Sequence, residues 1–178
     1  MDITRLDQVE KAIRPETKMI YTESMTNPML QISDLPALSA LSKKHGIKLL
    51  VDNTFTPMMI APSKLGADIV LYSMTKFING KNDCVAGAIC ADEPFIVALA
   101  DVNTGSAMLL GPVLDPMRSS AIHKNLHTLH IRMQQHSRNG LFLAERFEAY
   151  GLKTIYPGLK SHPQHELMKR IMHPDFGF

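Results

Sequence analysis

The sequence predicts an α/β fold, because helix-like and strand-like segments alternate along most of its length. Residues 49–51 form a continuous apolar run, which is typical of a parallel strand covered on both faces. A second strand candidate follows at residues 68–72, and residues 35–41 carry leucines at helical spacing. The chain of 178 residues is long enough to bury one substantial core.

The N-terminal half is expected to contain alternating helices and strands. The expected elements are a helix at about residues 2–13 that Pro15 ends, a strand at 18–22, a helix from the possible caps Ser33 or Asp34 to Gly46, and strands at 47–52, 68–72 and 85–91. Cys84 and Cys90 fall on the last strand, where we expect buried thiols and neither a disulfide nor a zinc site.

Beyond Pro112 the pattern becomes mainly helical. The expected elements are long helices at 117–132 and 136–150, a strand at 152–156 that begins after Gly151, and a helix at 164–172. There is no internal repeat and no low-complexity segment.

Composition limits the classes of function. The net charge of +2 comes from nearly balanced acids and bases, so nothing favours a nucleic-acid partner. No apolar run approaches the roughly 20 residues of a membrane span, and the start lacks a signal-peptide core. We therefore expect a soluble, cytoplasmic protein with no membrane partner. Among the eight histidines, His123, His127 and His130 have helical spacing. Exposed histidines, or a histidine-bearing helix face at a subunit contact, explain this spacing better than a metal site does.

The most informative residues follow two strand ends. Asp52 ends one buried strand, and Ser73, Thr75 and Lys76 follow the next, so all four lie at the sheet edge where ligands collect in α/β proteins. Pyridoxal phosphate needs a lysine for its aldehyde, an anion for its ring nitrogen and donors for its phosphate. Taken alone, however, Lys76 could also be a solvated surface residue, and the pair Asp52-Asn53 is also typical of a turn.

Longer stretches of sequence distinguish these interpretations. The chain resembles the Cys/Met-metabolism family of pyridoxal-phosphate enzymes, which includes cystathionine γ-lyase, cystathionine γ-synthase and methionine γ-lyase. The stretches that carry the resemblance are ESMTNP at 23–28, VDNTF at 51–55, LGADIV at 65–70, SMTKFING at 73–80 and DCVAGA at 83–88. Residues 105–112 and 156–165 look most like the methionine γ-lyase branch.

The resemblance implies a fold and an assembly. The fold would be the aspartate-aminotransferase-like fold type I, in which a three-layer α/β/α large domain binds the cofactor. Residues 1–127 would be part of that large domain, and residues 128–178 would form crossover helices and the start of a smaller C-terminal domain. The assembly would be a homotetramer built from dimers. The family sequence would extend beyond both ends, so we expect a fragment that lacks them.

The resemblance also implies roles residue by residue. Lys76 would form the Schiff base and shuttle protons, Asp52 would pair with the ring nitrogen, and Ser73 and Thr75 would lie near the phosphate. Asn27 would hydrogen-bond the phenolic oxygen, while its place before Pro28 also predicts a turn. The chain departs from many relatives at Tyr72, Phe77, Lys81 and Asn82, which puts substrate specificity in question.

The implied reaction is a carbon–sulfur lyase reaction on a sulfur-containing amino acid. Its expected form is α,γ-elimination of L-methionine to methanethiol, 2-oxobutanoate and ammonia. Cystathionine γ-lyase or γ-synthase activity is the alternative within the enzyme class. A shortened, catalytically inactive relative or assembly partner is the alternative outside it.

Overall fold

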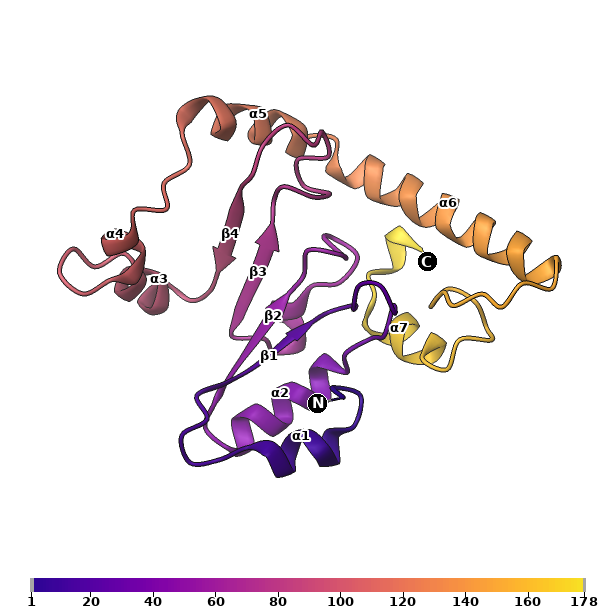
Figure 1. The fold of residues 1–178 in the computed structure, drawn as a ribbon, viewed down its shortest axis with the longest axis horizontal. Coiled ribbons are helices and arrows are strands. Elements are labelled where there is room, and N and C mark those ends of the chain that lie inside the picture. Colours follow the sequence, from indigo (N-terminus) through magenta and orange to yellow (C-terminus); the bar gives the residue numbers. More distant parts are fainter. Residues whose placement is uncertain (1, 178) are drawn as a thin grey trace.

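A four-stranded mixed sheet lies at the centre of the computed structural model, which describes residues 2–177 (Figure 1). Strands β1 (Met19–Glu23), β2 (Lys48–Asp52) and β3 (Ile69–Ser73) run parallel in that order, and β4 (Gly87–Cys90) pairs antiparallel with β3. The α/β class and the four strands expected in the N-terminal half are therefore confirmed, although β4 is shorter than its predicted range.

The register of the parallel strands brings their carboxyl ends to one edge. Glu23 of β1 pairs with Asp52 of β2, and Asp52 pairs with Leu71 of β3. Side chains alternate between the two faces of a strand. Leu49 and Val51 of β2 are fully buried, so this strand anchors the sheet in the core.

Helices α1 (Leu6–Ala12) and α2 (Leu35–Lys44) pack together, and α2 contacts β2. The predicted cap of α2 is confirmed at Asp34, whose Oδ1 accepts from the Ala37 backbone N–H at 3.2 Å. Helix α1 begins later than predicted because Asp2 accepts hydrogen bonds from the backbone and side chain of Thr4. Such local bonds compete with helix formation.

The chain then leaves the sheet as an arm of short helices. These are α3 (Glu93–Leu99), α4 (Ser106–Leu110) and α5 (Pro116–Leu126), which the sequence predicted only in part (Figure 1). Large apolar side chains of this arm are exposed, among them Leu110 and Val113, which are 82% and 88% accessible.

The predicted burial of the two cysteine thiols is wrong, and so is the place of Cys84 on the strand. Cys84 lies in the loop before β4 and is only half-buried, while Cys90 on β4 is exposed. Strand β4 pairs only with β3 among residues 2–177, so one edge of it stays open and its side chains are less covered than those of β2.

Helix α6 (Leu129–Ala149) is one continuous helix of 21 residues. The sequence placed a break at 133–135, but these residues are Met, Gln and Gln, which favour helix. The interruption lies at residues 127–128 instead, where the Thr128 hydroxyl donates to the Asn125 carbonyl at 3.2 Å. The strand expected at 152–156 is also wrong, because no described strand pairs with this segment.

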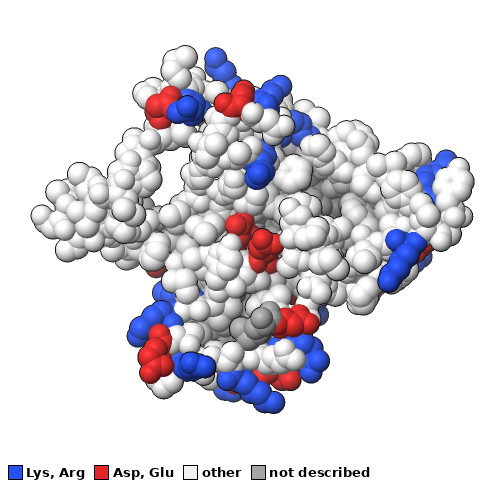
Figure 2. All heavy atoms as spheres, viewed as in Figure 1, with Lys and Arg blue, Asp and Glu red and all other residues white. Residues whose placement is uncertain are grey.

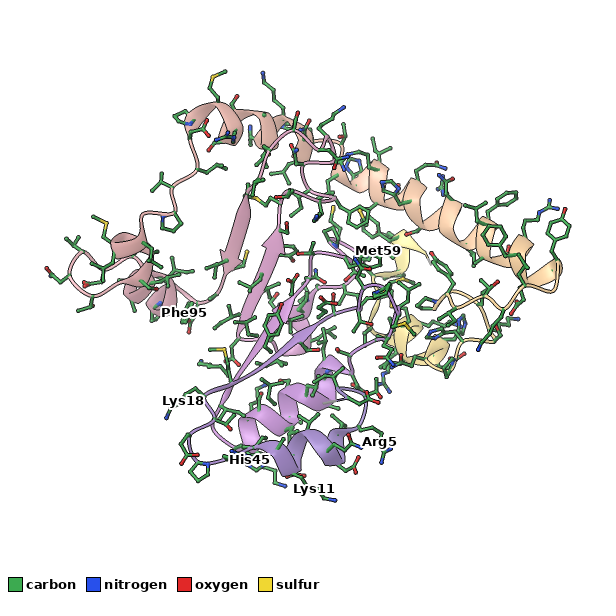
Figure 3. The ribbon with its side chains drawn as sticks, in the orientation of Figure 1. Arg5, Lys11, Lys18, His45, Met59 and Phe95 are labelled. Atoms are coloured by element: carbon green, nitrogen blue, oxygen red, sulfur yellow. The ribbon has the colours of Figure 1, made fainter. Side chains whose placement is uncertain are left out.

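The C-terminal segment returns to the sheet end. It contains α7 (His165–Ile171) and the 3₁₀ turn η2 (Pro174–Phe176). Gln164 exchanges two side-chain hydrogen bonds with the backbone of Ile32, and Met172 forms a bridge with Ile60. Met59, labelled in Figure 3, is buried where this segment, the sheet end and α6 meet.

The surface drawn in Figure 2 mixes charges of both signs. Basic and acidic side chains are interspersed over α1, α2 and α5, and acidic side chains lie near the centre of this face. Within residues 2–177 no helix combines the length and the apolar character needed to cross a bilayer.

Candidate functional site

A pocket of about 620 Å³ opens at the carboxyl ends of the parallel strands. It is lined by residues from β1, β2, β3, the segments that follow them and α6. Four of the five predicted site residues line it: Asn27, Asp52, Ser73 and Lys76. The topology therefore brings together side chains that lie up to 49 positions apart in the sequence.

Asp52 is held in place by the turn that follows β2. Its Oδ1 accepts from the Thr54 backbone N–H at 2.9 Å, and its Oδ2 accepts from the Tyr21 hydroxyl at 3.4 Å. Asp52 thus starts a turn and lines the pocket, so the two interpretations of this residue hold together. The long contact with Tyr21 leaves Oδ2 able to accept a stronger bond from a ligand.

Partial desolvation and the neighbouring Asp52 carboxylate raise the pKa of Tyr21, which is otherwise half exposed, above its ordinary value. The Tyr21 hydroxyl stays protonated and keeps donating to Asp52. Glu23, the β1 residue that lines the pocket, adds a second acidic group at this edge and raises the pKa of Tyr21 further. The edge is therefore acidic, which suits a cationic ring nitrogen.

The other strand ends are tied to Asp52 through backbone contacts. Ser73 donates its backbone N–H to the Thr54 hydroxyl at 2.7 Å, which joins the segments after β2 and β3. Asn27 begins the expected turn and donates its backbone N–H to Glu23 Oε2 at 3.1 Å. The side chains of Ser73 and Asn27 are not used in these contacts.

Lys76 lies in the turn that follows β3 and is exposed while lining the pocket. The Phe77 ring beside it packs edge-to-face against Phe55 and His136, with ring centroids 5.9 and 5.5 Å apart. The sequence predicted partly apolar surroundings for the lysine. The rings supply an apolar wall, but the lysine itself is not shielded from solvent in this chain.

Thr75 is the one predicted site residue outside this pocket. Its hydroxyl donates to the Ala86 carbonyl at 3.3 Å and accepts from the Ala86 backbone N–H at 3.0 Å. It lines a separate hollow with Asp83 and Arg118. In this arrangement Thr75 fastens the lysine turn to the segment before β4.

Sequence reasoning missed two pocket residues on α6, Arg132 and His136. With Thr128 they are spaced by four residues, so all three lie on one face of a helix. The break predicted between Arg132 and His136 hid this face. A continuous helix from 129 onwards would have revealed it.

The donor set of the pocket fits pyridoxal phosphate. A primary amine, a carboxylate with a free acceptor position, a hydroxyl and an amide all line one concave surface. Residues 2–177 contain no group of three potential ligands that could hold a metal ion. His123 and His127 stack edge-to-face, with centroids 5.3 Å apart, on an exposed surface.

Comparison with known proteins tests the resemblance independently. The chain is 41% identical over its whole length to "Methionine gamma-lyase" of Arabidopsis thaliana and spans 41% of that relative. It is 40% identical to "L-methionine gamma-lyase" of Porphyromonas gingivalis, and 41% identical to "Cystathionine gamma-lyase" of Homo sapiens. Those matches cover 97% and 96% of this chain and 44% and 42% of the relatives.

The chain therefore spans less than half the length of these curated relatives. The match to the family is nevertheless continuous and runs through every strand of the sheet. Residues 1–177 fit the family described as "Cys/Met metabolism PLP-dependent enzyme". With a pocket whose donors suit that cofactor and a match over nearly every residue, the chain belongs to this family of pyridoxal-phosphate-dependent enzymes.

Proposed function

We propose that the protein carrying this chain is a pyridoxal-phosphate-dependent carbon–sulfur lyase in which Lys76 binds the cofactor aldehyde. The observation that supports this most strongly is that Lys76 and Asp52 line the same pocket. Asp52 would accept a hydrogen bond from the ring nitrogen through Oδ2, and Asn27 and Ser73 would bind the phenolic oxygen and the phosphate. Thr75 would not contact the cofactor; its hydrogen bonds with Ala86 would hold the turn that carries Lys76.

The protein side chains supply proton transfers and orientation. When bound, the cofactor supplies a sink for the electrons released at the substrate Cα. The Lys76 amine is the group placed to take the Cα proton and to return protons further along the substrate chain. Phe55, Phe77 and His136 form the wall that would limit access of water on one side.

The substrate we propose is L-methionine, since relatives named methionine γ-lyase share 41% and 40% of residues with this chain. Its α,γ-elimination consumes one water and gives methanethiol, 2-oxobutanoate and ammonia. Cystathionine is the second candidate, because a relative named cystathionine γ-lyase is equally similar at 41%. Direct comparison of the two substrates, by 2-oxo acid formation, distinguishes these activities.

We propose the finer architecture on the same basis. The sheet would belong to a three-layer, fold type I large domain that ends near His127, and later residues would lead into a smaller domain. The assembly would be a tetramer built from dimers. An inactive relative that only assembles with a full-length subunit remains the alternative, and it is favoured by the large exposed apolar side chains of the arm.

The test of the Lys76 assignment is reductive trapping. Borohydride reduction of the full-length protein with pyridoxal phosphate should leave a pyridoxyl group on Lys76, located by peptide mass mapping. Lys76→Ala should lose this adduct, while Lys81→Ala, a control five residues away and also exposed, should keep it. Labelling of Lys64 or Lys81 in place of Lys76 would contradict the proposal.

A further inference from the structure

The Arg132 side chain binds the backbone of the turn that carries Lys76. Its Nη1 donates to the Phe77 carbonyl, and its Nη2 donates to the Ile78 carbonyl at 3.0 Å. The same guanidinium also reaches the end of α5, because Nη2 donates to the Asn125 carbonyl at 3.0 Å. One planar group thus joins the lysine turn to the corner between α5 and α6.

Gly80 lets this contact form. A Cβ added there would lie 2.6 Å from Arg132 Nη1, closer than real Cβ contacts allow. Its φ of +67° also favours glycine. The Gly80 backbone N–H donates to the carbonyl of Lys76 itself at 2.8 Å, so the arginine packs on the turn that closes around the lysine.

Asn79 makes a second, buried attachment to the same corner. Its Oδ1 accepts from Asn125 Nδ2 at 2.8 Å, and its Nδ2 donates to Asp83 Oδ1 at 2.7 Å. The side chain of Asn79 is fully buried. The turn is therefore fixed to α5 and α6 through both its backbone and a side chain.

Arg132 also lines the pocket, so binding of a substrate carboxylate is the competing role. The hydrogen bonds that Arg132 already makes argue against a role in substrate binding. Four of its five N–H groups are already used, because Nε also donates to the Thr128 hydroxyl at 3.2 Å. Only one N–H group remains, so an anion that binds the guanidinium through two N–H groups would have to displace one of these acceptors.

We infer that Arg132 is a positioning residue that sets the place of the Lys76 amine by clamping the turn at residues 77–78. This inference rests on the proposed function of Lys76. Groups in a reactive site must be held within about half an ångström, and a displacement of about 1 Å at a remote support can cost about a hundredfold in rate. A lysine side chain that starts from a mobile turn cannot meet this requirement.

The first experiment measures the clamp without the cofactor. Amide hydrogen exchange should be followed at Asn79 and Gly80, whose N–H groups donate within the turn. In the full-length protein, Arg132→Lys should raise both exchange rates about tenfold or more, because one ammonium cannot replace a fork that binds two carbonyls. Arg138→Lys, an exposed position on the same helix, is the control and should leave them unchanged. Equal protection in Arg132→Lys would overturn the inference.

The second experiment measures the consequence for the lysine. After reduction with pyridoxal phosphate, the ratio of labelling at Lys76 to labelling at Lys81 should fall about tenfold in Arg132→Lys and stay constant in Arg138→Lys. An unchanged ratio in Arg132→Lys overturns the inference and leaves the proposed function intact. Absence of label at Lys76 in the unmodified protein overturns the proposed function, whatever the exchange rates show.

Thermal unfolding separates positioning from general stability. If Arg132→Lys unfolds at the same temperature as Arg138→Lys while its labelling ratio falls, the effect is local to the lysine turn, as inferred. A substrate-binding role predicts the reverse pattern: labelling and exchange unchanged, and KM for the amino acid raised with Lys76 labelled normally. That pattern would assign Arg132 to the substrate instead.

Discussion

Asp52 serves both the backbone and the pocket with one carboxylate. Oδ1 closes the turn after β2, and Oδ2 faces the Tyr21 hydroxyl at a distance too long for a strong bond. A side chain that is already fixed through one oxygen needs little rearrangement when the other oxygen binds a ligand. This preorganisation is what an electrostatic partner requires.

Replacement of Asp52 by Asn tests the charge separately from the shape. The amide oxygen can still accept from the Thr54 backbone N–H, so the turn and cofactor binding should persist. Turnover should fall by roughly two or more orders of magnitude, the usual effect of losing one preorganised electrostatic contact. Steady-state assays and cofactor content measured on the same full-length sample provide the check. Nearly normal turnover would show that another group serves the ring nitrogen.

His162 predicts a pH dependence of stability. Burial lowers its pKa below the ordinary 6.5, and the nearby charge of His165 lowers it further. Its Nδ1 accepts from the Gln164 backbone N–H at 3.1 Å, which requires the neutral ring. His162 therefore binds a proton less readily in the folded state than in the unfolded state. The free energy of unfolding is fully present above about pH 6.5, the ordinary pKa, and it decreases as the pH falls through the lowered pKa.

Urea unfolding measured between pH 7.5 and pH 5, a range chosen around the ordinary histidine pKa of about 6.5, tests this prediction. His162→Gln should show a weaker loss of free energy of unfolding on acidification than the unmodified protein. His130→Gln is the control, because His130 is exposed on the helix surface. Identical slopes for all three proteins would assign the acid sensitivity to other groups.

The sequence predicted which side chains line one pocket better than it predicted what supports them. Lys76, Asp52, Ser73 and Asn27 could be placed together because strand ends in a parallel sheet share one edge. Arg132 could not, because its role depends on where a helix beyond the sheet crosses the lysine turn. The four-residue spacing of Arg132 and His136 indicates a shared helix face, but it does not indicate which turn that face contacts.

Helix α2 shows how local rules succeed at the scale of an element. Asp34 caps it with Oδ1, and its Oδ2 forms an ion pair with Arg170 at 3.0 Å. Caps and glycine stops follow from the backbone geometry of the helix ends alone. Helix α6 shows where such rules fail. The break between α5 and α6 lies at residues 127–128, which are His and Thr and include neither proline nor glycine.

Two substitutions at Asp34 separate the cap from the ion pair. Asp34→Ala removes both and should lower the free energy of unfolding by about 1 kcal/mol, the typical contribution of a cap. Asp34→Asn keeps the capping oxygen and removes only the ion pair with Arg170. It should lower the free energy of unfolding by only a few tenths of a kcal/mol, since exposed ion pairs contribute little. Chemical unfolding of both variants gives the comparison. An equal loss in both variants would show that the pair with Arg170 is the larger contribution.

At the scale of the whole molecule, the described surface is unusually apolar in places. The sheet has open edges at β1 and β4, and the arm exposes several large side chains. The most exposed are Val102, Leu109, Leu110, Val113 and Met117. Open edges and exposed apolar surface both favour association with other chains.

We therefore predict that the 178-residue chain, expressed alone, associates or depends on a partner subunit. It should release no detectable 2-oxo acid from methionine, cystathionine or cysteine, even with excess pyridoxal phosphate, because Lys76 is not shielded from solvent. Light scattering and a 2-oxo acid assay beside a full-length relative provide the measurements. A monodisperse chain that turns over any of these substrates would show that the described pocket is sufficient.

The strand register also constrains how the length of the protein can vary. Asp52 reaches the pocket because it is in step with Glu23 and Leu71 on either side. One residue inserted or deleted before it in β2 would turn its carboxylate to the opposite face of the sheet. Two inserted residues would restore the face but move the carboxylate about 6.6 Å along the strand. Neither odd nor even changes in β2 preserve the site, so we expect the protein to tolerate changes of length in its loops and not in this strand.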